Sequence, residues 1–130
     1  MYEAVTQGIR VRVVPEYSRD HSEPDEGRWF WVYTIEITNL GERTVQLMSR
    51  YWRITDANGR VEEVRGPGVV GEQPILAPGH THRYSSGCAL ATPSGIMSGT
   101  YRMVASDGSS FDATIPAFSL DSPDSRRTMN

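Results

Sequence analysis

The stretch Arg28–Leu40, RWFWVYTIEITNL, is the longest apolar run in the chain and predicts its central β-strand. Side chains alternate across a strand, so every second residue shares a face. One face carries Trp29, Trp31, Tyr33, Ile35 and Ile37, and the other carries Phe30, Val32, Thr34, Glu36 and Thr38. The first half is apolar on both faces, whereas the second half alternates. We therefore expect a central strand that is buried at its first end and half-exposed at its second.

Strand patterns continue on both sides of this stretch. Ile9–Val13 alternates apolar residues with arginine, and Pro15, which lacks a donor, is expected to end that strand. Val45 and Leu47 share one face, but the apolar phase shifts at Met48-Ser49, so that Trp52 falls on the other. Either a β-bulge at this point or a strand that crosses between two sheets explains the shift.

Turn residues separate the strands. Asn58-Gly59 predicts a type I′ hairpin that folds Arg60–Val64 back on Trp52–Thr55. Pro78-Gly79 and Asp107-Gly108 predict two further turns.

The second half of the chain contains a long stretch of small residues. We expect Ser85–Met97 to be a connection, followed by strands over Gly99–Ala105 and Phe111–Ile115, with Pro116 as the stop. The domain is expected to span residues 1–120, with residues 121–130 as a flexible tail that has little to anchor it.

No segment of ten residues shows helical apolar spacing, so the chain is predicted to be all-β, with about seven or eight strands. Its 130 residues, 38% of them apolar, suffice for one domain with a core. A Greek-key, immunoglobulin-like β-sandwich is the expected architecture, because an open sheet would leave an apolar face in water.

Charge and cysteine content limit the partners and the compartment. The net charge of −3 gives no general attraction to nucleic acid or to a membrane surface. Cys88 is the only cysteine, so no intramolecular disulfide forms, and a buried, inert thiol is the favoured state over a nucleophile. The N-terminus lacks a signal-peptide pattern, so we expect a cytoplasmic protein.

Motifs along nearly the whole chain, from about Val5 to Leu120, resemble those of the ApaG family, also called CorD. The matching residues include Tyr33-Thr34, Asn39-Leu40-Gly41, Val45-Gln46-Leu47, Arg50-Tyr51-Trp52, Asn58-Gly59, Gly66, Gly68-Val69-Val70-Gly71, Gln73-Pro74, Ala77-Pro78-Gly79, Thr92-Pro93, Phe111, Ile115-Pro116 and Phe118. The resemblance implies a fibronectin type III-like β-sandwich, in agreement with the strand pattern.

The resemblance implies a binding role more than a reaction. The bacterial family is linked to cobalt resistance and magnesium efflux, and related domains occur in an F-box protein and in a DNA-polymerase-delta-interacting protein. We therefore expect a non-catalytic module without a cofactor that binds another protein, with weak self-association left open.

The segment GPGVVG is a candidate anion site, formed by Gly66, Gly68, Val69, Val70 and Gly71. It fits G-x-G-x-x-G, which in this family has prompted the idea of diphosphate binding. That motif needs a helix directly after the loop, and Pro74 argues against one here. Pro67 offers no N–H and departs from the family pattern. A loop shaped by glycine is the favoured interpretation, and a nest of backbone N–H groups is the alternative.

Two other groups are weaker candidates. His80 and His82 share a predicted strand face and could supply two metal ligands, but no third ligand is near and the family lacks histidines there, so we predict no metal site. Arg50-Tyr51-Trp52 could form an exposed partner-binding patch, since such residues are enriched at binding hot spots; alternatively, Trp52 belongs to the core.

A catalytic reading has little support in the sequence. Ser85, Ser86, His82 and Asp107 are present, but no catalytic spacing organises them. We therefore expect no enzyme activity.

Overall fold

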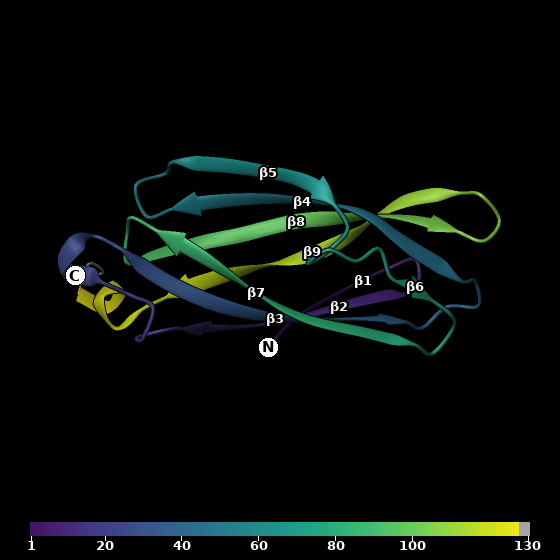
Figure 1. The fold of residues 1–130 in the computed structure, drawn as a ribbon, viewed down its shortest axis with the longest axis horizontal. Coiled ribbons are helices and arrows are strands. Elements are labelled where there is room, and N and C mark those ends of the chain that lie inside the picture. Colours follow the sequence, from purple (N-terminus) through teal and green to yellow (C-terminus); the bar gives the residue numbers. More distant parts are fainter. Residues whose placement is uncertain (128–130) are drawn as a thin grey trace.

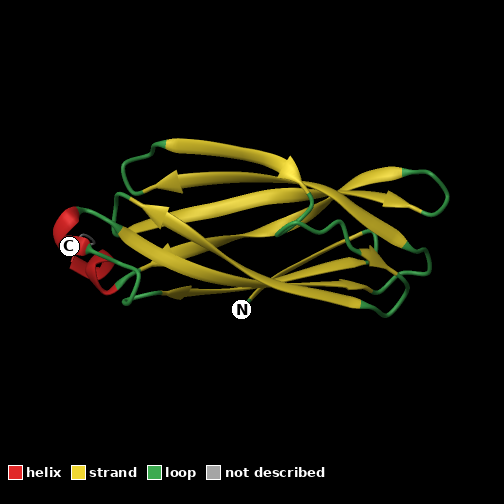
Figure 2. Ribbon diagram, viewed as in Figure 1, coloured by secondary structure: helices red, strands yellow, loops and turns green. Residues whose placement is uncertain are grey.

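The strands form two antiparallel sheets packed face to face in the computed structural model, which describes residues 1–127 (Figure 1, Figure 2). One sheet has the order β1-β2-β3-β7, and the other has the order β5-β4-β8-β9, with β6 paired to β4. The strands are β1 (Tyr2–Thr6), β2 (Ile9–Tyr17), β3 (Trp29–Asn39), β4 (Val45–Asp56), β5 (Val61–Pro67), β6 (Ile75–Leu76), β7 (Thr81–Leu90), β8 (Ser94–Ala105) and β9 (Ser110–Asp121). The predicted all-β sandwich is confirmed.

Helical structure within residues 1–127 is limited to two short 3₁₀ turns, η1 (Pro24–Glu26) and η2 (Pro123–Arg127). No helix in this part of the chain has the length and apolar character needed to cross a membrane.

The central strand lies where the sequence places it, as β3 between β2 and β7. Its buried inner face consists of Trp31, Tyr33, Ile35 and Ile37. On the outer face Phe30 and Val32 stay partly exposed, so the alternation runs through the whole first half. The expected gradient along the strand is wrong, because Thr38 and Asn39 at the second end are buried. The Asn39 side chain is satisfied there by donating to two backbone carbonyls.

A β-bulge explains the phase shift in β4. The register between β4 and β8 slips between Leu47 and Ser49, which leaves Met48 as the extra residue. The strand pairs with β8 on both sides of the slip, so it stays in one sheet and the crossing alternative does not hold. After the bulge Arg50 and Trp52 face the interior, and Trp52 is only 3% exposed.

The Asn58-Gly59 hairpin forms with the predicted pairing, in which Trp52 lies opposite Val64. Its turn type differs from the prediction, since Gly59 has positive φ and Asn58 does not. Asp56 accounts for the difference: its carboxylate accepts hydrogen bonds from the backbone N–H groups of Asn58 and Arg60 and closes a longer loop.

Both strand-ending predictions based on proline are wrong. β2 continues through Pro15 to Tyr17, because β1 pairs with it only up to Val13 and the rest of β2 needs a partner on one side only. β9 continues past Pro116 to Asp121 through a bulge, where the register with β8 slips between Met97 and Gly99.

The expected connection over Ser85–Met97 is also wrong, because most of it belongs to β7 and β8. Its small residues face large neighbours instead of forming a loop. A Cβ atom at Gly87 would lie 2.3 Å from the Phe30 ring, and one at Gly95 would lie 2.7 Å from the Thr55 carbonyl oxygen. Glycine fills these strand positions because nothing larger fits.

The start of the expected tail packs against the sandwich. The Trp29 indole donates to the Asp124 carboxylate at 3.0 Å, and the Trp31 indole donates to the Asp121 carbonyl at 2.8 Å. Ser122 and Ser125 are buried. Residues 128–130 of the predicted tail lie outside the described residues.

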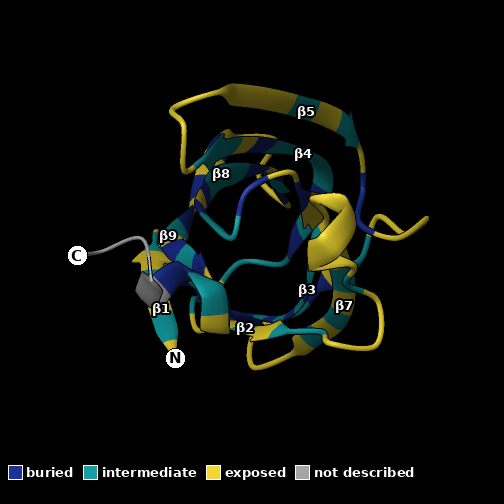
Figure 3. Ribbon diagram, turned by 90° about the vertical axis from the view of Figure 1, so that its left-hand side faces the viewer, coloured by how far each residue is buried: buried dark blue, intermediate teal, exposed yellow. Residues whose placement is uncertain are grey.

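The two long sides of the sandwich differ. On one side β1 packs against β9, where Tyr2 and Ser119 share a hydrogen bond and Thr6 accepts one from the Thr114 backbone. On the other side β5 and β7 stand apart (Figure 3). Between the sheets, the rings of Tyr33, Trp52 and Phe118 pack at centroid distances of 5.4–5.9 Å. The open side, next to this aromatic cluster, is where the cleft described below lies.

Candidate functional site

A cleft of about 370 Å³ opens between the sheets on the β5–β7 side. Its apolar wall includes Trp52, Ile54 and Val64. Its polar lining includes Tyr33, Arg50, Tyr84, Ser86 and Cys88. We refer to this space as the inter-sheet cleft. Its size and mixed lining are typical of sites that bind small molecules.

Arg50 reaches the rim of the cleft because of the bulge that precedes it and the glycine beside it. A Cβ atom at Gly66 would lie 2.9 Å from Arg50 Nη1. From this position Nη1 donates to the carbonyls of Pro67 and Gly68, at 3.0 and 3.1 Å. Arg50 thus fastens the start of the glycine loop to β4.

The predicted anion-binding loop, Gly66–Gly71, forms the rim of the cleft through Val69 and Val70. Val69 and Glu72 exchange two backbone hydrogen bonds around a tight turn in which Val70 and Gly71 both have positive φ. Gly68 has φ +58°, and its N–H donates to the Met48 carbonyl. The loop leads into β6 and not into a helix. The glycines at 68 and 71 therefore serve the backbone conformation.

Tyr33 and Tyr84 line the cleft, and a third tyrosine, Tyr101, contacts Tyr84. The hydroxyls of Tyr84 and Tyr101 share a hydrogen bond. Burial raises the pKa of Tyr33, Tyr84 and Tyr101 above the ordinary value of 10.0, although the nearby charge of Arg50 acts in the opposite direction. The three phenols are therefore neutral hydrogen-bonding groups at physiological pH.

Cys88 is buried, and burial raises the pKa of its thiol to about 11. A thiol with this pKa is protonated near pH 7 and is a poor nucleophile. The location agrees with the buried, inert thiol favoured from the sequence.

The predicted partner patch is divided between the two faces of β4. Trp52 faces the cleft and Tyr51 lies on the outer face, whereas Arg50 lines both the cleft and the open groove on the outer side. There the Arg65 guanidinium lies over the Tyr51 ring, 4.6 Å from its centroid, and the Tyr51 hydroxyl donates to Glu63 at 2.9 Å.

Tyr51 and Arg65 form one wall of an open groove of about 710 Å³. Thr100, Arg102 and Asp112 form another part of its lining, and Arg102 pairs with Asp112 at 3.2 Å. We call this space the outer groove. Arg53 is exposed on the same strand as Tyr51 and has no carboxylate partner within residues 1–127.

The two candidate metal ligands do not form a metal site in the described structure. His80 precedes β7 and is exposed in the Pro78-Gly79 turn, whereas His82 lies within β7 and faces Glu72, with 3.7 Å between Nε2 and Oε2. Within residues 1–127 no group of three or more His, Cys, Asp or Glu side chains could hold a metal ion.

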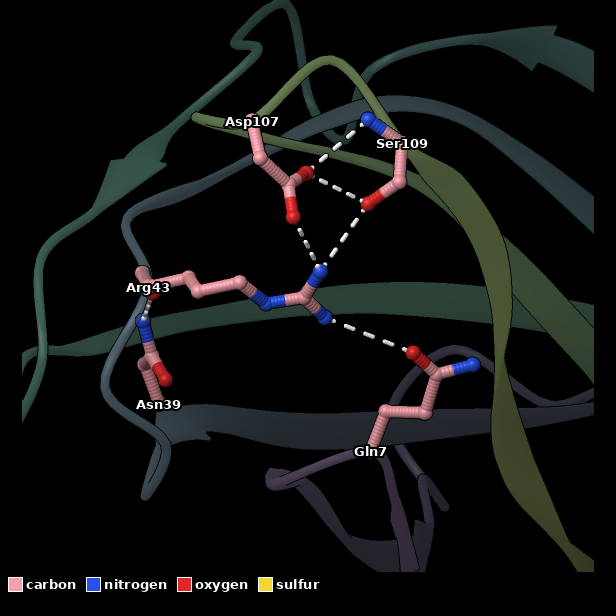
Figure 4. Close-up of polar contacts among 5 residues, drawn as sticks. All are labelled: Gln7, Asn39, Arg43, Asp107 and Ser109. Atoms are coloured by element: carbon pink, nitrogen blue, oxygen red, sulfur yellow. Dashed lines mark hydrogen bonds and ion pairs between the residues drawn. The ribbon is translucent and has the colours of Figure 1, made fainter.

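The four residues considered for catalysis, Ser85, Ser86, His82 and Asp107, do not form one cluster. The Ser85 hydroxyl bonds to Thr34 on the outer face of the first sheet, and Ser86 lines the cleft. Asp107 lies in the β8–β9 hairpin with Arg43 and Ser109 (Figure 4). There is thus no nucleophile and base in one place among these side chains.

The Asp107 cluster joins three loops at the end of the sandwich. Arg43 Nη1 donates to Asp107 and Ser109 at 3.0 and 2.9 Å, and Nη2 donates to Gln7 at 3.4 Å (Figure 4). Hydrogen bonds from Ser109, together with the Arg43 guanidinium, lower the pKa of Asp107 to about 2. This arrangement is a structural clamp.

Comparisons with known proteins give a consistent result. The family model described as the ApaG domain matches residues 19–105. The chain is 62% identical to Protein ApaG of Methylocella silvestris and 62% identical to Protein ApaG of Brucella anthropi, in each case over 100% of both chains. The crystal structure of a Bordetella pertussis protein designated ApaA superposes with a TM-score of 0.86 at 48% identity, covering 88% of this chain and 94% of that one. The chain therefore belongs to the ApaG family.

Proposed function

We propose that this chain is a non-catalytic module that binds another protein, and that the partner docks in the outer groove. The observation that carries the proposal is the surface pair of the half-buried Tyr51 and the exposed Arg65, which is already assembled in the free protein. Tyrosine and arginine are the residues that most often dominate binding at protein interfaces. A side-chain pair that is ordered before binding loses less conformational entropy when the partner arrives.

The position of the pair also favours a partner of stated chemistry. Arg65 and Arg102 border the groove, and Arg53, which has no carboxylate partner in the described part of the chain, lies on the strand of Tyr51. Arg65 forms an ion pair with Glu63, and Arg102 forms one with Asp112. Both pairs lie at the exposed surface, where an ion pair contributes little free energy. A partner segment that brings a carboxylate and an apolar side chain can replace these contacts and stack on Tyr51.

Family membership supports a binding role but does not identify the partner. The link to cobalt resistance and magnesium efflux is carried over from the family. In this proposal the chain would contribute to these processes by binding a protein partner. We propose no cofactor. No described cluster of side chains supplies a reaction centre, and Ser86, Asp107 and His82 have separate neighbours.

Diphosphate binding at the Gly66–Gly71 loop is the second candidate, and the loop geometry gives it less support. The N–H groups of Gly68 and Val69 are engaged in backbone hydrogen bonds, and Pro67 has none. An anion at this loop would have to compete with those bonds or use the N–H groups of Val70 and Gly71 alone.

Quantitative affinity capture from the native cytosol tests the proposal. We expect a protein to be retained by the wild-type chain and by Arg12→Ala, a control on the outer face of the other sheet. Tyr51→Ala and Arg65→Ala should each lower its retention tenfold or more. Equal retention by all four chains would show that the outer groove is not the docking surface.

A further inference from the structure

We propose that the inter-sheet cleft binds a small organic carboxylate, with its anionic group at Arg50 and its apolar body against Trp52 and Val64. This site lies on the inner side of β4 and the docking groove of the proposed function on its outer side, with Arg50 at the border of both spaces. Either proposal can fail without the other.

The first argument is the charge of Arg50. The residue faces the space between the sheets, where a charged side chain normally has a partner of opposite charge. Within residues 1–127 no ion pair includes Arg50. Its hydrogen bonds within the described chain go to two neutral carbonyls and use Nη1 alone. The donors on Nε and Nη2 are left for an anion.

The second argument is the set of neutral hydroxyl groups in the same cleft. Tyr33, Tyr84 and Ser86 line it together with Arg50. A carboxylate beside the guanidinium can accept further hydrogen bonds from such hydroxyls, and charge-assisted bonds of this kind are stronger than neutral ones. Nothing in the lining of the cleft is acidic, so the ligand carboxylate would be in direct contact with no negatively charged side chain there.

The third argument concerns the rest of the ligand. Most of the remaining lining is apolar and includes Ile54, Val69 and Met97. A bare inorganic anion would leave this surface uncovered, whereas a carboxylate with an aromatic or branched body would bury it at about 25 cal/mol per Å². A single guanidinium also matches one carboxylate better than a polyphosphate.

Amide NMR titration with 3-phenylpropanoate as the probe tests this inference. The neutral 3-phenylpropanamide and inorganic phosphate are the matched ligands. We expect 3-phenylpropanoate to shift the amides of Arg50, Tyr84 and Ser86, and to bind at least tenfold more tightly than either matched ligand. Arg50→Gln should weaken binding tenfold or more, and Arg53→Gln, an exposed arginine on the same strand, should not change it.

A steric variant keeps the test independent of the glycine loop. Ser86→Leu places bulk in the cleft but leaves Arg50 and its two carbonyl partners in place, and it should abolish the shifts in a chain whose spectrum is otherwise native. Equal affinity for the acid and its amide, equal affinity for phosphate, or unchanged binding by Ser86→Leu would each overturn the inference. An absence of shifts in the cleft would show that Arg50 only fastens the loop.

Discussion

The Arg50 guanidinium covers Gly66 so closely that a Cβ atom at position 66 would lie 2.9 Å from Nη1. Because Gly66 has no side chain, Arg50 can donate hydrogen bonds to the carbonyls of Pro67 and Gly68 and so hold the rim of the inter-sheet cleft. Arg50 thereby connects β4 to the glycine loop Gly66–Gly71.

Substitution of Gly66 should move Arg50 with little effect on the fold. Gly66→Ala displaces the end of a flexible side chain, so we expect a loss of about 1 kcal/mol in the free energy of unfolding, the value of a hydrogen bond. Gly99→Ala should cost about 3 kcal/mol or more, because its Cβ would meet a backbone carbonyl at 2.0 Å. Urea unfolding measures the free energy of unfolding of both variants. Equal losses would contradict the view that position 66 faces a movable side chain and position 99 faces fixed backbone.

Val70 is strained in the present sequence. It has φ +47°, a conformation that β-branched residues avoid, and it is 66% exposed. Val70→Asn removes the strain, so we expect the free energy of unfolding to rise by about 1 kcal/mol. Thermal unfolding of Val70→Asn beside Val70→Thr, which keeps the branched Cβ, checks this. A gain shared by both variants would mean that backbone strain is not the cause.

The Asp107 clamp should make stability depend on pH in the acid range. Its folded pKa of about 2 lies below the ordinary 3.8, so the ionised form is the stabilised one. The contribution is present above the ordinary value and is lost as the pH falls from about 3.8 to about 2. We expect the wild type to exceed Asp107→Asn in urea midpoint at pH 7, and the two midpoints to converge near pH 2. A constant difference would contradict the role of the carboxylate.

Cys88 should react slowly while the chain is folded. A pKa of about 11 instead of the ordinary 9.0 lowers the thiolate population about 100-fold at pH 8, and burial restricts access further. Reaction with an aromatic disulfide reagent should therefore be at least 100-fold faster in urea than in buffer. Similar rates in both would place the thiol at the surface.

The architecture could be predicted from the sequence because it depends on local patterns. The alternation in Arg28–Leu40 predicts the central strand and Asn58-Gly59 predicts the hairpin, and both elements form. The phase shift at Met48 left two explanations open, and the register with β8 shows the bulge. The errors come from residues whose role depends on a neighbour in space. Pro15 and Pro116 are tolerated because their strands have an unpaired side or a bulge.

The candidate site was harder to predict for the same reason. Gly87 is required by Phe30, which is far away in the sequence. The inter-sheet cleft brings Arg50 of one sheet close to Tyr84 and Ser86 of the other, and no sequence motif predicts that these residues lie together. One signal was available: after the bulge at Met48, strand alternation places Arg50 on the same face as Trp52.

Site-specific photo-crosslinking in living cells tests the proposed docking surface most directly. A benzophenone amino acid replaces Thr100, which lines the outer groove beside Tyr51, or, as the control, Thr34 on the outer face of the other sheet. We predict one discrete crosslinked protein from position 100, lost when Arg65→Ala is added, and no such product from position 34. The same product from position 34, or no product from position 100 in a folded chain, would contradict the proposed docking surface.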